Sequence, residues 1–257
     1  MIISIANQKG GVGKTTTTVN LATALAACGK TVLLIDLDPQ GNASTGLGLP
    51  QSARKIGSYD VVFGDATIQE AAMKTEIPNL FIVTANSELC GAEVELVDAT
   101  RREYRLKDAL SKAQIPFDYV LIDCPPALGF LTLNALTASD RVLVPLQCEF
   151  YALEGLSFLM QTVQRVKASF NARLDLLGVV LTMYDRRNKL SEQVEEDVRE
   201  HFGEKVFKTV IPRNVRVSEA PSHGKPVLLY DLNCPGSRAY MYLASELLKS
   251  EQMRISA

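Results

Sequence analysis

The stretch that decides the fold reads Lys9-Gly10-Gly11-Val12-Gly13-Lys14-Thr15-Thr16. The apolar residues 2–6 before it predict a strand, and residues 15–28 after it predict a helix that stops at Gly29. Glycines allow the backbone to bend so that its N–H groups turn toward anionic oxygens, and the positive end of the helix dipole favours the same anions. A strand, a glycine-rich turn and a helix in this order predict a phosphate-binding loop, with nucleotide contacts along residues 9–16.

The two lysines of this loop are assigned different tasks. Lys14 and Thr15 hold the last two places of G-x-x-x-x-G-K-[ST], so Lys14 is expected to bind the β- and γ-phosphates and Thr15 to ligate Mg²⁺. The first glycine of that pattern would fall at residue 8, which is Gln8, and Lys9 stands directly before the glycine pair. Because Lys14 fills the space over its own nucleotide, Lys9 is expected to project outward. From there it would neutralise transition-state charge on the nucleotide of a second subunit, as an arginine finger does.

Aspartates follow two further apolar strands. Asp36 ends the predicted strand at residues 31–36, Asp38 lies just beyond it, and Asp123 ends the predicted strand at residues 117–123. Carboxylates at strand ends beside a phosphate loop are suited to hold Mg²⁺, which we predict for Asp36 and Asp123. Asp38 is placed to position the attacking water. The alternative is that these aspartates only cap turns or helices.

Strand-length apolar runs alternate with helical segments along the whole chain. Further strands are predicted at residues 80–84, 141–146, 174–183 and 206–210, and further helices at 104–113, 153–168, 190–201 and 238–249. Runs such as residues 32–35 are apolar at every position, which is typical of strands covered on both faces. The predicted fold class is α/β, with a single doubly wound, mostly parallel sheet and helices on both faces, in one P-loop ATPase domain over residues 1–257. Residues 49–79 are polar and carry no clear pattern.

The composition excludes several classes of protein. The 257 residues are 47% hydrophobic with a net charge of −2, which is ordinary for a globular protein. No uncharged apolar run is long enough to cross a bilayer and no basic leader precedes the first strand, so a cytoplasmic location is expected. The cysteines form no CxxC pair, so neither a zinc nor a redox motif is indicated. Buried free thiols are expected at Cys28, Cys90, Cys124, Cys148 and Cys234.

Several stretches resemble the deviant Walker A ATPases, and more narrowly the ParA/Soj chromosome-partitioning proteins. They are Lys9-Gly10-Gly11-Val12-Gly13-Lys14-Thr15, Asp36-Leu37-Asp38-Pro39-Gln40-Gly41-Asn42, Asp123-Cys124-Pro125-Pro126, and residues 133–140, 147–156 and 211–226. The resemblance extends from residue 1 to about residue 248. The first motif marks the superfamily, and the last separates partition proteins from their relatives.

The resemblance implies a nucleotide-switched mechanism that uses ATP, ADP and Mg²⁺. ATP binding would close two subunits into a homodimer in which Lys9 contacts the nucleotide of the other subunit. Asp38 would orient the water, Lys14 would act on the phosphates, and the loop of Pro212, Arg213 and Asn214 would lie near the adenine. The dimer would bind DNA of the nucleoid without sequence preference. A ParB-type protein at a centromere-like site would stimulate hydrolysis and release the dimer.

Two basic clusters are candidates for the DNA surface. One contains Arg186, Arg187 and Lys189, and the other contains Arg213 and Arg216. A local patch suffices on an acidic protein, because the phosphate contribution to binding depends on nearby Lys and Arg. The DNA-contacting arginines of the resembling family match Arg187 and Arg216; the alternative is that all of these are solvated loop charges. No recognition-helix motif is visible, so contact with phosphates and not with bases is expected.

Three alternatives remain on the same scaffold. A MinD-like membrane-positioning ATPase would need a basic amphipathic helix at the C-terminus, but residues 247–257 are short and mixed in charge. The second alternative is a metabolic or metal-cluster enzyme, such as a relative of the nitrogenase iron protein, but the scattered cysteines give no obvious cluster ligands. A protein with ParA chemistry that moves a cargo other than a chromosome stays open.

Overall fold

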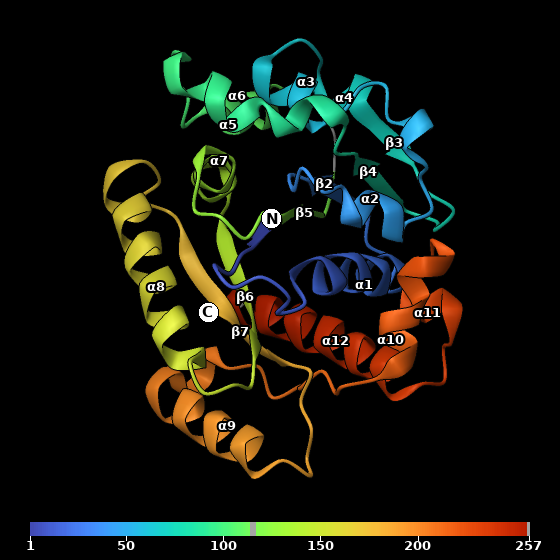
Figure 1. Ribbon diagram of the computed structural model, residues 1–257, viewed down its shortest axis with the longest axis vertical. Helices are drawn as coiled ribbons and strands as arrows, with labels where there is room; N and C mark the ends of the chain where they lie inside the picture. The colour runs from blue at the N-terminus through green and yellow to red at the C-terminus, as the bar shows by residue number, and fades with distance from the viewer. Residues whose placement is uncertain (114–116, 256–257) are drawn as a thin grey trace.

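The computed structural model describes residues 1–113 and 117–255 and has one seven-stranded sheet at its centre (Figure 1). The strands run in the order β3-β4-β2-β5-β1-β6-β7. Their bounds are β1 (Ile2–Ile5), β2 (Val32–Asp36), β3 (Ala72–Lys74), β4 (Leu80–Val83), β5 (Tyr119–Asp123), β6 (Arg141–Gln147) and β7 (Asp175–Thr182). Every neighbouring pair is parallel except β3 with β4. This arrangement confirms the predicted α/β class with a mostly parallel sheet.

Helices cover both faces of the sheet. They are α1 (Lys14–Ala27), α2 (Asn42–Gly46), α3 (Ser58–Phe63), α4 (Ile68–Ala71), α5 (Ala92–Glu95), α6 (Arg105–Lys112), α7 (Phe130–Ala138), α8 (Ala152–Ser169), α9 (Lys189–Phe202), α10 (Val215–Glu219), α11 (Val227–Tyr230) and α12 (Pro235–Ile255). Helices α1, α11 and α12 pack on one face, and α3 to α9 pack on the other (Figure 1). Within β2, Val32 and Leu34 belong to the first hydrophobic core, which lies between the sheet and α1, α11 and α12. Leu33 and Ile35 belong to the second hydrophobic core, which lies between the sheet and α3 to α9. Both faces of the strand are therefore buried, which explains its continuous apolar run.

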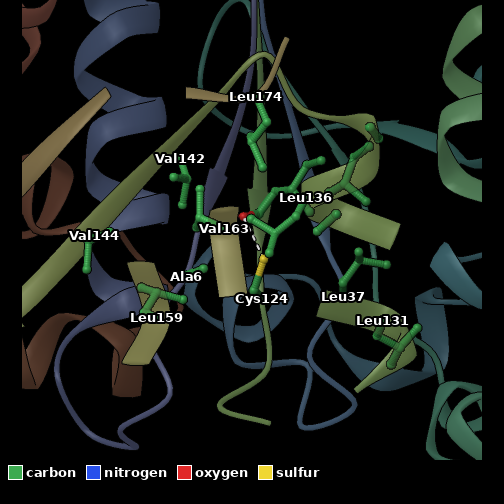
Figure 2. Packing of buried hydrophobic residues seen from close by; sticks show 14 of the residues in the cluster. Ala6, Leu37, Cys124, Leu131, Leu136, Val142, Val144, Leu159, Val163 and Leu174 are labelled. Carbon is green, nitrogen blue, oxygen red and sulfur yellow. Dashed lines mark hydrogen bonds between the residues drawn. The ribbon is translucent and has the colours of Figure 1, made fainter. Parts of the chain in front are cut away.

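The residue after Asp123 shows how tightly the second core is packed. Cys124 is fully buried and lies among aliphatic side chains of α7 and α8, including Leu136 and Val163 (Figure 2). Burial raises the pKa of its thiol well above the ordinary value. A thiol held neutral inside an apolar core is inert, so Cys124 contributes packing and not chemistry.

The prediction that all five cysteines are buried free thiols is only partly right. Cys124, Cys148 and Cys234 are buried, but Cys28 and Cys90 are exposed. Cys28 is the C-cap residue of α1, beyond the part of the helix that faces the core, and Cys90 lines a surface cavity.

The predicted strand at residues 206–210 is wrong. Val206 makes a single bridge to Val179 of β7. The N–H groups of Lys208 and Thr209 donate instead to the carboxylate of Glu246 on α12, at 2.6 and 3.0 Å. A side chain from another element takes donors that a strand needs for its ladder, so the segment passes the sheet edge without continuous pairing.

Residues 49–79, which carried no pattern, form short pieces that cover one end of the sheet. They include α3, α4 and the antiparallel edge strand β3. Helix α4 begins with a capping box in which Thr67 and Glu70 satisfy each other's backbone N–H groups. Helix α7 was also not predicted. Its first N–H groups, at Phe130 and Leu131, donate to the Glu93 carboxylate, a cap that comes from a distant segment of the chain.

Helix α12 packs along α1 at the first face of the sheet (Figure 1). Its residues Tyr240, Leu243 and Leu247 are buried there. The apolar side of this helix is therefore used within the fold. Among the helices of the described part of the chain, none is long and apolar enough to span a membrane.

Candidate nucleotide site

The loop between β1 and α1 has the backbone geometry expected of a phosphate cradle. Gly11 and Gly13 have left-handed φ angles of 75° and 86°, which residues with a side chain rarely adopt. The Thr182 hydroxyl at the end of β7 donates to the Val12 carbonyl at 2.8 Å. A Cβ atom on Gly13 would lie 3.9 Å from Thr182 and Met183, so the loop rests on the end of β7.

Lys14 folds back over this loop. Its Nζ donates to the Lys9 carbonyl at 3.0 Å, and the residue is only 7% exposed. Burial lowers the pKa of Lys14, and the negative charge of Asp123 opposes that shift. An ammonium group with one carbonyl partner in the described structure has donors left for an anion held by the loop.

Asp123 is the carboxylate with an available oxygen. The register of β2 and β5 pairs Asp36 with Asp123, so the two carboxylates lie at the same sheet edge. Oδ1 of Asp123 accepts from the Thr18 hydroxyl at 2.9 Å, whereas Oδ2 is buried without a hydrogen-bond partner among the described residues. Burial first, and then the charge of Asp36, raises the pKa of Asp123 to about 8. A buried oxygen without a partner is costly, and a hydrated Mg²⁺ would relieve that cost, so the residues present fit this ion.

Asp36 is engaged within the protein. Its Oδ2 accepts from the backbone N–H and the hydroxyl of Ser44, at 2.8 and 2.7 Å, and its Oδ1 accepts from the Asp38 N–H at 3.3 Å. Burial raises the pKa of Asp36 to about 6. Asp36 therefore fastens α2 to the end of β2, and of the two predicted metal carboxylates Asp123 is the better placed.

Asp38 begins the turn that leads into α2. Its Oδ1 accepts from the Gln40 N–H at 3.0 Å, and its carbonyl accepts from the Gly41 N–H at 2.8 Å. Across residues 1–113 and 117–255, no three His, Cys, Asp or Glu side chains are grouped to hold a metal ion. Mg²⁺ bound together with phosphates needs few protein ligands. That Thr15, Asp36 and Asp123 hold Mg²⁺ therefore stays a prediction.

Lys9 points away from its own loop, as its predicted role requires. Its backbone N–H donates to the Asn7 side chain at 3.0 Å, which fixes the start of the turn. Its ammonium forms an ion pair with Glu149 in the segment before α8, and its side chain is 47% exposed. The neighbouring Phe150 and Tyr151 are exposed aromatic residues. The role of Lys9 toward a second subunit remains a prediction.

The loop predicted to lie near the adenine runs beside the end of β7. Pro212 forms a bridge with Tyr184, and the Arg213 N–H donates to the Tyr184 carbonyl at 3.0 Å. Asn214 caps α10 by accepting from the Val217 N–H at 3.3 Å. Because Met183 faces Gly13, this loop is close to the phosphate cradle in the fold, and its contact with the base remains a prediction.

A cavity of about 260 Å³ runs along the start of α1. Thr15 and Thr16 line one part of it, and Lys225 and Pro226 line another. The motif at residues 211–226 therefore meets the phosphate loop at this cavity. The side chain of Asn20 supports the contact, because its Oδ1 accepts from the Val227 N–H at 2.7 Å.

Two hydroxyl groups near the carboxylates were missed by the sequence reasoning. Thr18 bonds to Asp123 and Ser44 bonds to Asp36. A signal existed for Thr18, because it lies four residues after Lys14 and hence on the same face of α1. The pairing of Ser44 with Asp36 had no such signal, since it depends on how α2 turns back on the sheet.

The two basic clusters are exposed, and one arginine of each is paired with a carboxylate. Arg187 contacts Asp185 at 3.2 Å. Arg216 contacts Glu219 at 3.0 Å and Asp231 at 3.6 Å. A polyanion at these positions would compete with the protein's own carboxylates. The remaining members, Arg186, Lys189 and Arg213, are exposed as well.

Sequence comparison identifies the family to which this geometry belongs. Residues 1–176 match a family model described as an AAA domain. The chain is 63% identical over 255 residues to the chromosome partitioning protein ParA of Caulobacter vibrioides. This alignment covers 98% of this chain and 96% of the relative. The chain belongs to the ParA family of chromosome-partitioning proteins. Another relative of this ParA-family chain, the sporulation initiation inhibitor protein Soj of Bacillus subtilis, is 54% identical over 246 residues, covering 96% of this chain and 97% of the relative.

Solved structures support the same fold for this ParA-family chain. The crystal structure of cobyrinic acid a,c-diamide synthase from Mycobacterium smegmatis matches with a TM-score of 0.85 and 38% identity, covering 98% of this chain and 95% of the other. That structure contains bound ADP and magnesium. The predicted resemblance to ParA/Soj proteins and the P-loop fold are confirmed.

Proposed function

We propose that this ParA-family chain is a Mg²⁺-dependent ATPase whose ATP-bound homodimer binds DNA. The observation that carries the ATPase assignment is a left-handed glycine loop together with the buried Lys14 ammonium, bonded to the Lys9 carbonyl, and, at the neighbouring strand end, a buried Asp123 oxygen without a hydrogen-bond partner among the described residues. The backbone of residues 10–13, together with Lys14 and Thr16, would bind the phosphates of ATP or ADP. Thr15 and Asp123 would hold Mg²⁺, which supplies charge stabilisation for phosphoryl transfer.

Hydrolysis requires a positioned water molecule and neutralised charge. Asp38 is the carboxylate of the turn that follows β2, and it would orient the water toward the γ-phosphorus as the β–γ phosphoanhydride bond breaks. Lys14 neutralises charge from within the subunit, and Lys9 does so from the second subunit. The outward direction of the Lys9 ammonium supports this division.

The DNA-binding state would be the ATP dimer. Arg187 and Arg216, with Arg186 and Lys189 beside them, would contact phosphates without reading bases. A ParB-type protein at a centromere-like site would stimulate hydrolysis and release the dimer, so that chromosome or plasmid DNA is moved. The ParA relative, which is described as a chromosome partitioning protein, supports the partition role. That role would place the protein in the cytoplasm on the nucleoid. Carriage of another cargo is the alternative.

The test is DNA binding with ATP, with ADP and without nucleotide across a salt series, alongside light scattering. We expect a dimer and DNA retention only with ATP, with an affinity that falls steeply with salt and is the same for unrelated sequences. Anionic lipid vesicles form a parallel arm. Binding to vesicles in place of DNA, or DNA binding that ignores the nucleotide, would overturn the proposal.

A further inference from the structure

We infer that Arg54 is a positioning residue that holds the Asp38 turn in place for ATP hydrolysis. The inference rests on the proposed ATPase function and extends it to a residue outside every motif of the sequence. Arg54 lies in residues 49–79, just after the short helical turn Gln51–Ala53, and is half-buried.

The Arg54 guanidinium joins three points of the segment around α2. Its Nη1 donates to the Gly41 carbonyl at 3.2 Å, at the start of α2. Its Nη2 donates to the Thr45 hydroxyl at 2.8 Å, within the helix. Its Nε and Nη2 both donate to the Leu49 carbonyl, at 3.1 and 2.7 Å, beyond the helix end. The planar fork of an arginine reaches all three acceptors at once, which a lysine ammonium cannot do.

The Gly41 contact connects Arg54 to Asp38. The Gly41 N–H closes the turn on the Asp38 carbonyl at 2.8 Å, and the Gln40 N–H holds the Asp38 carboxylate at 3.0 Å. Gly41 has a left-handed φ of 63°, and a Cβ atom there would collide with Nη1 of Arg54. Only glycine therefore permits both the turn and the close approach of the guanidinium.

The turn needs this restraint because one of its sides faces open space. A cavity of about 350 Å³ is lined by Pro39, Gln40 and Arg54. Atoms that face a cavity lack packing partners on that side, so packing alone does not stop the turn from shifting outward. Asp36 anchors α2 through Ser44 from the sheet side, and Arg54 anchors it from the cavity side.

The prediction concerns turnover and not nucleotide affinity. Arg54→Ala should lower kcat for ATP by about tenfold to a hundredfold, the cost of a displaced catalytic group, while ATP affinity changes by less than about threefold. Arg54→Lys keeps the charge but should lose most of the turnover. Lys55→Ala changes the exposed neighbouring residue and should leave kcat unchanged. Single-turnover hydrolysis and titration with a fluorescent ATP analogue measure both quantities, and thermal unfolding shows whether each variant is folded.

A double-mutant cycle with Asp38→Ala separates positioning from general damage. If Arg54 acts through Asp38, Arg54→Ala costs no further turnover in the Asp38→Ala background. An equal loss in both backgrounds, or wild-type kcat in folded Arg54→Lys, would overturn the inference. Failure of the proposed function looks different: the wild type would not hydrolyse ATP, or Asp38→Ala would turn over normally. Should Arg54→Ala not fold, Arg54→Lys decides by the same criteria.

Discussion

At the scale of single residues, we expect Asp123 to make the free energy of unfolding depend on pH. In the metal-free protein, burial and the Asp36 charge raise its pKa from 3.8 to about 8. A carboxyl group whose pKa is higher in the folded chain binds more protons when folded. Its contribution therefore favours the folded state at low pH and is lost as the pH rises from about 4 through about 8.

Asp123→Asn removes the titration while keeping an oxygen for the Thr18 hydroxyl. In the presence of a chelator we expect this variant to exceed the wild type by about 1–3 kcal/mol in free energy of unfolding near pH 8, with a small difference at or below about pH 4. Urea denaturation at several pH values measures it. Parallel pH profiles for the two proteins would show that Asp123 titrates normally.

At the scale of elements, Glu246 replaces a strand ladder with a side-chain contact. Its carboxylate accepts from two consecutive N–H groups, at Lys208 and Thr209, and so joins α12 to the chain beyond α9. Glu246→Ala leaves both donors without this partner, and we expect it to lower the free energy of unfolding by about 1–2 kcal/mol. Lys249→Ala, at an exposed position of the same helix, is the control. Equal unfolding midpoints for the two variants would contradict the role of Glu246.

The same element shows where sequence reasoning ends. The strands of the sheet centre were predicted because both of their faces are buried, which leaves an unbroken apolar run. The roles of the glycines in residues 9–16 and of the aspartates at strand ends were predicted because they can be recognised from the residues directly beside them in the sequence. The segment at residues 206–210 was mistaken for a strand, since its donors are taken by Glu246 from 38 residues away. Arg54 was missed for the same reason: its acceptors come together only when α2 is folded.

At the scale of the whole molecule, Lys9 is predicted to decide the oligomeric state. Its ammonium lies outside its own loop, paired with Glu149. Lys9→Ala should therefore bind ATP about as tightly as the wild type but remain a monomer, because the contact with a second nucleotide is lost. Light scattering with ATP measures the mass, and Lys112→Ala, an exposed lysine on α6, should dimerise normally. An ATP dimer of Lys9→Ala would remove the cross-subunit role.

The proposed DNA binding is a property of the whole molecule, and the net charge of −2 disfavours it, so we expect it to depend on local cations. Arg216 is expected to contact a phosphate in competition with its carboxylate partners Glu219 and Asp231. Arg216→Ala should weaken binding to all sequences alike and reduce the salt dependence, as the slope of log affinity against log salt, by about 1. Arg173→Ala, at a position that is 87% exposed in its side chain, should change neither quantity if this surface is remote from the DNA.

Replacing Glu219, a carboxylate partner of Arg216, should change DNA affinity in the opposite direction to Arg216→Ala. Glu219→Gln removes one competing anion while keeping a group that can bond to the Tyr230 hydroxyl. If Arg216 binds phosphate, Glu219→Gln should strengthen DNA binding, and the gain should vanish in the Arg216→Ala background because no cation is left to release. Filter binding or fluorescence anisotropy with ATP over a salt series measures the wild type, the two single variants and the double variant. A gain in affinity that persists in the Arg216→Ala background would mean that Glu219 acts only through the general charge of the surface. For Arg216→Ala itself, a loss of affinity confined to one DNA sequence would mean that Arg216 reads bases.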